Sequence, residues 1–285
     1  MNLKATVPSK PGLPYALAVR ERRVLVPIAR RCPFGCRYCY ADDVTITPTD
    51  DVDLAVVVAA VVQLDPSSYD VIQLGYDGDP IASSSALRQM LPGLAATGKH
   101  INISTKGTTT AKVREFLGDM HRRTPAGISL NVSATCWDSA PTVEPRTPSP
   151  PHRLRSASLL YDEQNIPFVL SLRPLLPSVR DDELHTLLES AHASGALAAV
   201  TGPLYVQPDG RNMTWTSTTF EHVAPSRVSW SPAPLHYRRV EDPARVEKLK
   251  TYSESIGLPL YRSNADALRQ LMARANEGTT EETVS

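Results

Sequence analysis

The sequence lacks the features that mark nucleic-acid-binding and membrane-spanning proteins. It has no surplus of either charge, because 30 Lys and Arg residues balance 30 Asp and Glu residues. Proteins that bind nucleic-acid phosphates usually carry a basic surplus, so a nucleic acid is not an expected partner. The longest apolar run, residues 54–64, is about half of the ~20 residues that a membrane-spanning helix needs. A membrane is therefore not an expected partner either.

Cysteine is also scarce. The chain has four cysteines, and three of them fall within residues 32–39. Such clustering does not suit a disulfide framework, which spreads its cysteines over a small secreted domain. The N-terminus lacks the positively charged start and unbroken apolar stretch of a signal peptide. These absences predict a cytoplasmic protein in a reducing compartment.

What the sequence does have is a regular alternation of strand-like and helix-like segments. At 285 residues and 41% hydrophobic, it can bury a core in one domain. The alternation predicts an α/β fold with a parallel sheet. Six strands favour a partial (β/α)6 barrel of TIM type, with parallel strands, over a full eight-unit barrel. The expected strands are 23–28, 70–74, 100–105, 127–133, 166–172 and 198–200, and the expected helices are 53–64, 83–97, 108–123, 152–164 and 181–194.

The extent of this alternation predicts four parts of the chain. Residues 1–22 form an N-terminal extension, and residues 23–202 form the barrel core. Residues 203–276 form a C-terminal extension that caps the barrel, and the polar tail 277–285 is expected to be disordered. Within the cap, residues 203–240 suit a short hairpin or a cover over the barrel. A helix at 243–256, a strand at 258–261 and a helix at 265–275 complete it.

A cysteine loop directly follows the first expected strand, with the sequence Cys32-Pro-Phe-Gly-Cys36-Arg-Tyr-Cys39. Three thiolates from one loop can ligate three irons of a cubane cluster. The fourth iron then stays open, like the open position of a catalytic zinc site. Structural zinc is the alternative, but zinc needs four ligands. The remaining cysteine, Cys136, lies far along the chain, and no histidine is near the loop.

This loop resembles the signature of the radical S-adenosyl-L-methionine (SAM) superfamily, in which an aromatic residue precedes the last cysteine. Tyr38 fills that position. The resemblance implies that Cys32, Cys36 and Cys39 hold a 4Fe-4S cluster and that the methionyl group of SAM chelates the open iron. It also implies reductive cleavage of SAM to methionine and a 5′-deoxyadenosyl radical, which abstracts hydrogen from a substrate. An electron donor such as flavodoxin or ferredoxin is the implied partner.

Further likenesses, within residues 23–175, point toward the spore photoproduct lyase-like branch of that superfamily. The loop after the second expected strand is similar to the glycine and acid loop that receives the methionyl ammonium, although a plain tight turn is the alternative. Carbonyls and a carboxylate can meet an amine where glycine permits close approach. The implied SAM-binding residues of this loop are Gly75, Asp77, Gly78 and Asp79.

Later strand ends supply the other implied SAM contacts. Lys106 is similar to a lysine that meets the methionyl carboxylate, with a solvated charge as the alternative. Ser133 is placed to bond the ribose, or is a plain strand-end hydroxyl. Glu144 and Arg153 match the Glu-Pro element and the following arginine of the branch. This pair would order the loop near SAM through a charge-assisted bond, and a purely structural salt bridge is the alternative.

One departure from the branch bears on the reaction. Spore photoproduct lyases carry a hydrogen-donating cysteine in the loop where this chain has Tyr76 and Asp77. The expected substrate is therefore a small organic molecule, such as a nucleoside or a sugar. A nucleic-acid base repair or modification enzyme is the alternative, and a non-catalytic zinc- or nucleic-acid-binding protein is the outside one. Cys136 either returns a hydrogen atom to the substrate or fills the core as a small hydrophobe.

Overall fold

The computed structural model describes residues 18–28, 32–39, 53–76, 78–206, 223–227 and 236–281. Its strands are β1 (Ala18–Arg20), β2 (Arg23–Val26), β3 (Val71–Leu74), β4 (His100–Thr105), β5 (Ile128–Ser133), β6 (Phe168–Leu172), β7 (Ala199–Thr201), β8 (Leu204–Val206), β9 (Val223–Arg227), β10 (His236–Val240) and β11 (Leu260–Tyr261). Its α-helices are α1 (Leu54–Val62), α2 (Ser84–Ala95), α3 (Ala111–Arg123), α4 (Ala140–Val143), α5 (Pro150–Gln164), α6 (Asp181–Ala193), α7 (Pro243–Ser255) and α8 (Asn264–Glu281).

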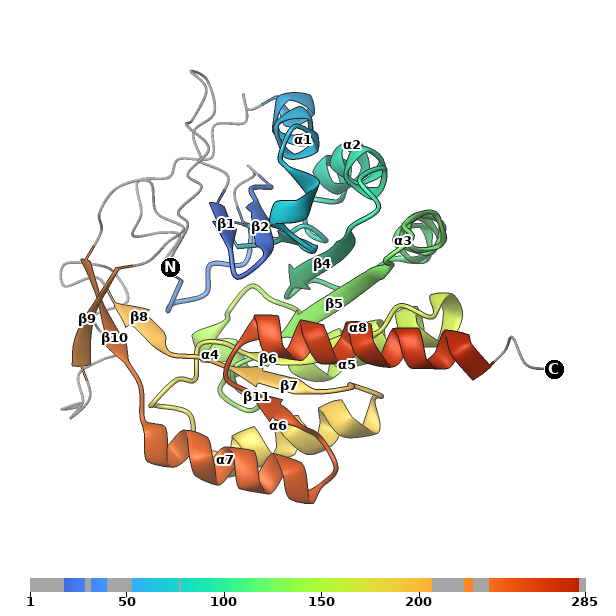
Figure 1. Cartoon of the computed structure of the whole chain (residues 1–285). Helices are drawn as coiled ribbons and strands as arrows, with labels where there is room; N and C mark the ends of the chain where they lie inside the picture. Colours follow the sequence, from blue (N-terminus) through green and yellow to red (C-terminus); the bar gives the residue numbers. More distant parts are fainter. Residues whose placement is uncertain are drawn as a thin grey trace.

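The main sheet has eight strands in the order β1-β2-β3-β4-β5-β6-β7-β11 (Figure 1). Strand β1 runs antiparallel to β2, and every later neighbouring pair is parallel. No pairing joins β1 to β11 within the described part of the chain, so the barrel stays open. The predicted α/β partial barrel is confirmed. The strand expected at 258–261 joins the parallel set as β11, and β1 lies in the segment that was expected to be only an extension.

Local capping explains where several helices begin. The Asp53 side chain accepts a hydrogen bond from the Ala55 N–H at the start of α1, at 2.9 Å. Thr110 caps α3 and Asp242 caps α7 in the same way. Such caps satisfy backbone donors that have no partner inside the helix. These signals lie in the local sequence, and the predicted starts agree with them to within a few residues.

The sheet has an apolar outer face, and its inner face is polar on β4 and β5. Outward residues of β4 and β5, such as Ile103 and Leu130, belong to one buried hydrophobic cluster with Leu91 of α2 and Leu117 of α3. Figure 1 shows α1, α2, α3, α5, α6 and α7 arranged around this outer side. Because successive side chains of a strand alternate between faces, the other residues of these strands face inward. On β5 those residues are Ser129, Asn131 and Ser133.

Helix α8 lies on the inner side of the sheet instead. Its residues Ala267, Leu268 and Leu271 form a second hydrophobic cluster with inward residues that include Val169 of β6 and Val200 of β7. Figure 1 shows α8 lying across these strands. The helix continues to Glu281, beyond the predicted end at Ala275. No proline interrupts residues 276–281, so part of the tail expected to be disordered is helical, and residues 282–285 lie outside the described residues.

The C-terminal extension also contains a small antiparallel sheet, in the order β8-β10-β9. Its three strands fall within the segment 203–240, for which a hairpin or a cover was expected. Strand β8 leads directly from the end of β7, so this sheet lies beside the carboxyl edge of the parallel strands (Figure 1). Among the described residues, no helix is both long and apolar enough to cross a membrane.

Candidate functional site

A cavity of about 310 Å³ opens at the carboxyl ends of the parallel strands, which is where α/β sheets bind ligands. Its lining comes from the cysteine loop, from the ends of β2 to β6, from β8 and from the first residue of α8. Most of the predicted site residues meet here, although they are spread over a hundred positions of the sequence. Those that line the cavity are Cys32, Cys36, Tyr38, Cys39, Gly75, Gly78, Asp79, Lys106 and Ser133.

The three loop cysteines supply a thiol donor set on one wall of this cavity. Cys36 is buried, and Cys32 and Cys39 are partly buried. Burial raises the pKa of Cys32 to about 12 and that of Cys36 to about 11, so both are protonated thiols near neutral pH. Among the described residues, no group of three His, Cys, Asp or Glu side chains is arranged to hold a metal ion. The donor set itself suits an iron–sulfur cluster, and binding one would release the thiol protons.

Glycine is required in the middle of the cysteine loop. Gly35 has a φ of +59°, a region that other residues rarely adopt. A Cβ at this position would also lie 2.2 Å from Nη2 of Arg146. The Arg146 guanidinium therefore packs directly on the loop between the cysteines.

The Tyr38 hydroxyl connects the cysteine loop to a buried ion pair. It donates a hydrogen bond to Oε1 of Glu144, whose Oε2 accepts one from Nη2 of Arg153. Arg153 also donates to the Ser133 carbonyl at 2.7 Å and to the Pro148 carbonyl at 2.6 Å. Burial, together with the Glu144 charge, raises the pKa of Tyr38 well above its ordinary value, so the phenol stays protonated.

The predicted pairing of Glu144 with Arg153 is therefore present, with both side chains fully buried. Neither residue lines the cavity among the described residues. Their positions agree with the loop-ordering role common to both interpretations. A buried charge pair is expensive to break, because the remaining partner would be left uncompensated away from water.

Lys106 is held at the cavity wall by three groups. Its Nζ donates to Oγ of Ser133 at 2.6 Å and lies 3.9 Å from Oε1 of Glu144. It also lies 5.6 Å from the centre of the Tyr38 ring. The ammonium is thus oriented toward the ends of β4 and β5 rather than left as a freely solvated charge. This placement suits the recognition of a carboxylate in the cavity.

Asp79 uses its carboxylate to close the loop after β3. It accepts from Oγ1 of Thr105 at 2.8 Å, from the Lys106 N–H at 2.6 Å and from the Ala82 N–H at 2.9 Å. These bonds tie the loop to the end of β4. They favour the tight-turn interpretation of Asp79 over that of an unengaged carboxylate awaiting an ammonium.

Two glycines accompany Asp79 in this loop. Gly75 has a φ of +95°, and a Cβ there would lie 2.3 Å from the Ser104 carbonyl oxygen. Only glycine permits this close approach of the loop to β4. Gly78 lines the cavity, and Asp77 lies outside the described residues. Because glycine has no side chain, Gly75 and Gly78 present backbone atoms to the cavity.

Cys136 is placed apart from the cavity. Its side chain has no exposed surface and belongs to the main hydrophobic cluster, and burial raises its pKa to about 12. Among the described residues, it does not line the cavity. The adjacent segment is anchored by Glu183 of α6, which accepts from the Trp137 N–H and from both the N–H and the hydroxyl of Ser139. This environment favours the core interpretation of Cys136.

Several cavity residues were not singled out from the sequence. They come from the inner faces of the strands and from α8, and include Asn131, Ser171 and Asn264. The alternation of Ser129, Asn131 and Ser133 along β5 was a usable signal, because polar residues on the inner face of a buried strand need polar partners. Asn264 gave no such signal, since its neighbourhood depends on where α8 docks.

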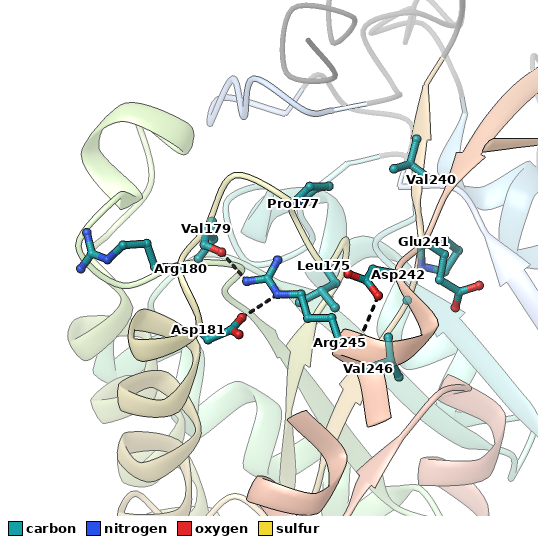
Figure 2. A pocket seen from close by; sticks show the side chains of 12 residues that line it. Leu175, Pro177, Val179, Arg180, Asp181, Val240, Glu241, Asp242, Arg245 and Val246 are labelled. Carbon is teal, nitrogen blue, oxygen red and sulfur yellow. Dashed lines mark hydrogen bonds and ion pairs between the residues drawn. The ribbon is translucent and has the colours of Figure 1, made fainter. Parts of the chain in front are cut away.

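A second cavity, of about 470 Å³, lies between the segment after β6 and the start of α7. Figure 2 shows Arg245 crossing it. The Arg245 guanidinium donates to Asp181 at 2.6 Å, to the Leu176 carbonyl at 3.0 Å and to the Val179 carbonyl. The Arg245 guanidinium thus joins α7 to the segment after β6 and to Asp181 at the start of α6. This cavity lacks the thiols and strand-end groups of the first.

Comparison with known sequences finds distant relatives without an assigned activity. No protein-family model matches the chain. Uncharacterized proteins of Mycobacterium tuberculosis and Mycobacterium bovis are 26% identical to it over 241 residues, which cover 78% of this chain and 68% of theirs.

Comparison with solved structures identifies the fold. A mutant of spore photoproduct lyase superposes with a TM-score of 0.66 and 12% identity over 89% of this chain and 79% of that one. A radical SAM methyltransferase from Sphaerobacter thermophilus gives a TM-score of 0.60 and 18% identity over 88% and 70%. SuiB from Streptococcus suis, bound to SAM, gives 0.57 and 11% over 87% and 52%. The chain therefore has the fold of the radical SAM superfamily.

Proposed function

We propose that this protein is a radical SAM enzyme whose Cys32, Cys36 and Cys39 hold a 4Fe-4S cluster. The proposed reaction begins with reductive cleavage of SAM to methionine and a 5′-deoxyadenosyl radical. The radical then abstracts hydrogen from a small organic substrate. One observation carries the proposal: three thiols of a single loop line the same cavity as Lys106 and Ser133. That cavity lies at the carboxyl edge of a sheet with the radical SAM fold.

When bound, the cluster supplies the electron that breaks the C–S bond of SAM. The protein's own groups then bind and orient SAM. The Lys106 ammonium, held by Ser133 and Glu144, binds the methionyl carboxylate. The Ser133 hydroxyl is available to the ribose, and the Gly75 and Gly78 backbone to the methionyl ammonium. Arg146 packs against Gly35 of the cysteine loop.

The substrate that this site suits best is a small uncharged molecule such as a nucleoside or a sugar. The chain has no net charge with which to bind a nucleic-acid backbone. Its loop after β3 also has Tyr76 where lyases of the branch carry a hydrogen-donating cysteine. The likeness to spore photoproduct lyase keeps nucleic-acid base repair or modification as the second candidate. The proposed chemistry needs a reductant such as flavodoxin or ferredoxin and a reducing compartment such as the cytoplasm.

The test is anaerobic reconstitution followed by iron, sulfide and product analysis. The wild-type protein should bind about four irons per chain and form 5′-deoxyadenosine from SAM with dithionite, measured by mass spectrometry. Cys36→Ala should abolish both results. Cys136→Ala is the matched control, because it makes the same substitution at a buried cysteine outside the loop. Stoichiometric zinc without labile sulfide, or a Cys36→Ala variant that still forms 5′-deoxyadenosine, would refute the proposal.

A further inference from the structure

The inner wall of the cavity contains a buried hydrogen-bond donor without a partner. Asn264, the first residue of α8, lines the cavity and is 2% exposed. Its Oδ1 accepts from Nδ2 of Asn131 at 2.7 Å, which fixes the orientation of the amide. Its own Nδ2 has no hydrogen-bond partner among the described residues. Buried polar groups are almost always paired, so this donor points to a group that is supplied from outside the chain.

The position of Asn264 relates it to the proposed SAM contacts. Its partner Asn131 and the SAM-side residue Ser133 lie on the same face of β5, two residues apart. Two residues of a strand span about 6.6 Å. Asn264 therefore lies about one pleat deeper in the cavity than the Lys106–Ser133 pair. A substrate at that depth would lie next to the proposed SAM contacts.

The polar groups nearest this position on β5, β6 and α8 are neutral, and the charged side chains that line the same cavity include Arg23 and Arg173. Asn131 and Asn264 present amides, and Ser171 of β6 presents a hydroxyl from the neighbouring strand, in register with Ser133. Arg23, which also lines the cavity, donates to Gln73 at 2.8 Å and to Glu21 at 2.9 Å. An amide N–H and a hydroxyl are well matched to the uncharged oxygen atoms of hydroxyl and carbonyl groups.

Anchoring of α8 does not account for the unpaired donor. The helix is already held by Ala267, Leu268 and Leu271 in the inner hydrophobic cluster. The bond from Asn131 uses only Oδ1 of Asn264. A purely structural asparagine would gain nothing from leaving its N–H buried and unpaired, because that loss is not recovered in the folded protein.

We propose that Asn264 is a substrate-binding residue of an inner subsite, bordered on its SAM side by Ser171, for an uncharged, oxygen-rich compound of the nucleoside or sugar class. The Nδ2–H donates to a hydroxyl or carbonyl oxygen of that compound. The inference rests on the proposed function and extends it, because it assigns the C-terminal helix a direct part in substrate recognition. It involves binding only, and no bond is made or broken at Asn264.

The test measures binding of adenosine, uridine and glucose to the reconstituted, SAM-loaded protein by equilibrium dialysis. At least one of these probes should bind the wild type, and Asn264→Ala should weaken that binding about tenfold, as the loss of one good hydrogen bond predicts. Asn102→Ala is the matched control. It also removes a buried amide bonded to Asn131, but Asn102 does not line the cavity among the described residues. It should change binding by less than about threefold.

A second variant, Asn264→Asp, distinguishes a loss of binding from a loss of folding. A second measurement, of 5′-deoxyadenosine, tests the proposed function separately. Asn264→Asp retains the acceptor for Asn131 and removes the donor, so it should weaken binding even if Asn264→Ala does not fold. Failure of all probes to bind, equal loss in the Asn264 and Asn102 variants, or tighter binding of uridine 5′-monophosphate than of uridine would overturn the inference. Formation of 5′-deoxyadenosine by the wild-type protein without substrate is measured in parallel. Its absence from the wild type would instead refute the proposed function.

Discussion

The two sides of the cavity are built differently. On the cysteine side, Tyr38, Glu144 and Arg153 form a buried network in which both carboxylate oxygens and all three guanidinium nitrogens have partners. On the inner side, a ladder of polar side chains runs from His100 through Asn131 to Asn264. There the Asn102 Oδ1 and the Asn264 Nδ2 stay unpaired among the described residues.

The difference indicates that the cysteine side of the cavity holds the fold in place, whereas the unpaired donor on the inner side binds a ligand. A fully satisfied buried network holds the surrounding segments in one geometry, and breaking any member is costly. A buried group left unpaired at a cavity wall contributes nothing until a ligand completes it. Substitutions on the cysteine side should therefore lower stability, and substitution of Asn264 at the cavity wall should lower binding. The predictions below test that contrast, beginning with the largest effect.

Removal of Glu144 should have the largest effect on stability. Glu144→Ala leaves the Arg153 guanidinium buried without its carboxylate, which should cost about 3–5 kcal/mol in the free energy of unfolding. Urea denaturation followed by circular dichroism measures it. The control is Glu163→Ala, which breaks a pair in which Glu163 is 41% exposed and should cost less than about 1 kcal/mol. Equal losses in the two variants would contradict the supporting role of the network.

The Tyr38 hydroxyl should matter next. Tyr38→Phe keeps the ring beside Lys106 but removes the donor to Glu144, and bonds to charged groups are worth about 1.5–3 kcal/mol. The variant should lose that much stability and still bind iron. Tyr252→Phe, which removes a bond to Glu189 at the surface, should have the smaller effect. If Tyr38→Phe were as stable as the wild type, the hydroxyl would not connect the loop to the network.

Cys136→Ala should have a modest effect on stability and none on chemistry. A small truncation in the core costs about 1 kcal/mol, and Cys136 has no exposed surface. If Cys136 instead donates hydrogen to the substrate radical, the variant would still cleave SAM but would give misquenched or solvent-derived products. Mass spectrometry of the products in deuterated water distinguishes the two roles. We expect an unchanged product profile.

The ladder of polar side chains on the inner side should produce the smallest effect. This effect is a dependence of the free energy of unfolding on pH. Burial lowers the pKa of His100, whose Nδ1 donates to the Ala126 carbonyl and whose Nε2 accepts from Ser129. The neutral ring is therefore favoured in the folded state. The stabilisation is complete above the ordinary pKa of about 6.5 and is lost as the pH falls through the lower folded value.

Thermal denaturation between pH 7.5 and pH 5, a window about the ordinary histidine pKa, measures this dependence. The melting temperature should fall toward acid pH, and His100→Gln should flatten the curve. His121, whose pKa is also lowered by burial, contributes with the same sign, so the double variant with His121→Gln should be flatter still. A double variant with the wild-type slope would assign the pH dependence to other groups.

Sequence reasoning reached the frame of the molecule because the relevant signals are local. The period of the apolar residues identified six of the parallel strands. Capping residues such as Asp53 lie at the starts of helices in the structure. The spacing of Cys32, Cys36 and Cys39 is a property of one short loop and needs no partner to be read. Strand β1 was not predicted, because it pairs antiparallel with β2 and stands outside the alternation of strands and helices.

The contacts between distant segments of the site could not be predicted in the same way. That Glu144 pairs with Arg153 followed from a local motif, but the bond from Tyr38 depends on how the cysteine loop folds over α4. The engagement of Asp79 depends in turn on how β3 and β4 meet at their ends. Both contacts join segments whose separation in the sequence carries no information about their distance in space.

By itself, the sequence determined the α/β class, the strand order along the chain and the cysteine loop at the end of the first parallel strand, because periodicity and motif spacing are local properties. Only the tertiary structure decided that α8 docks inside the open barrel and brings Asn264 to Asn131, 133 residues away in the chain. Docking of that kind follows from the whole apolar surface that must be buried at once. No single segment of the sequence contains it.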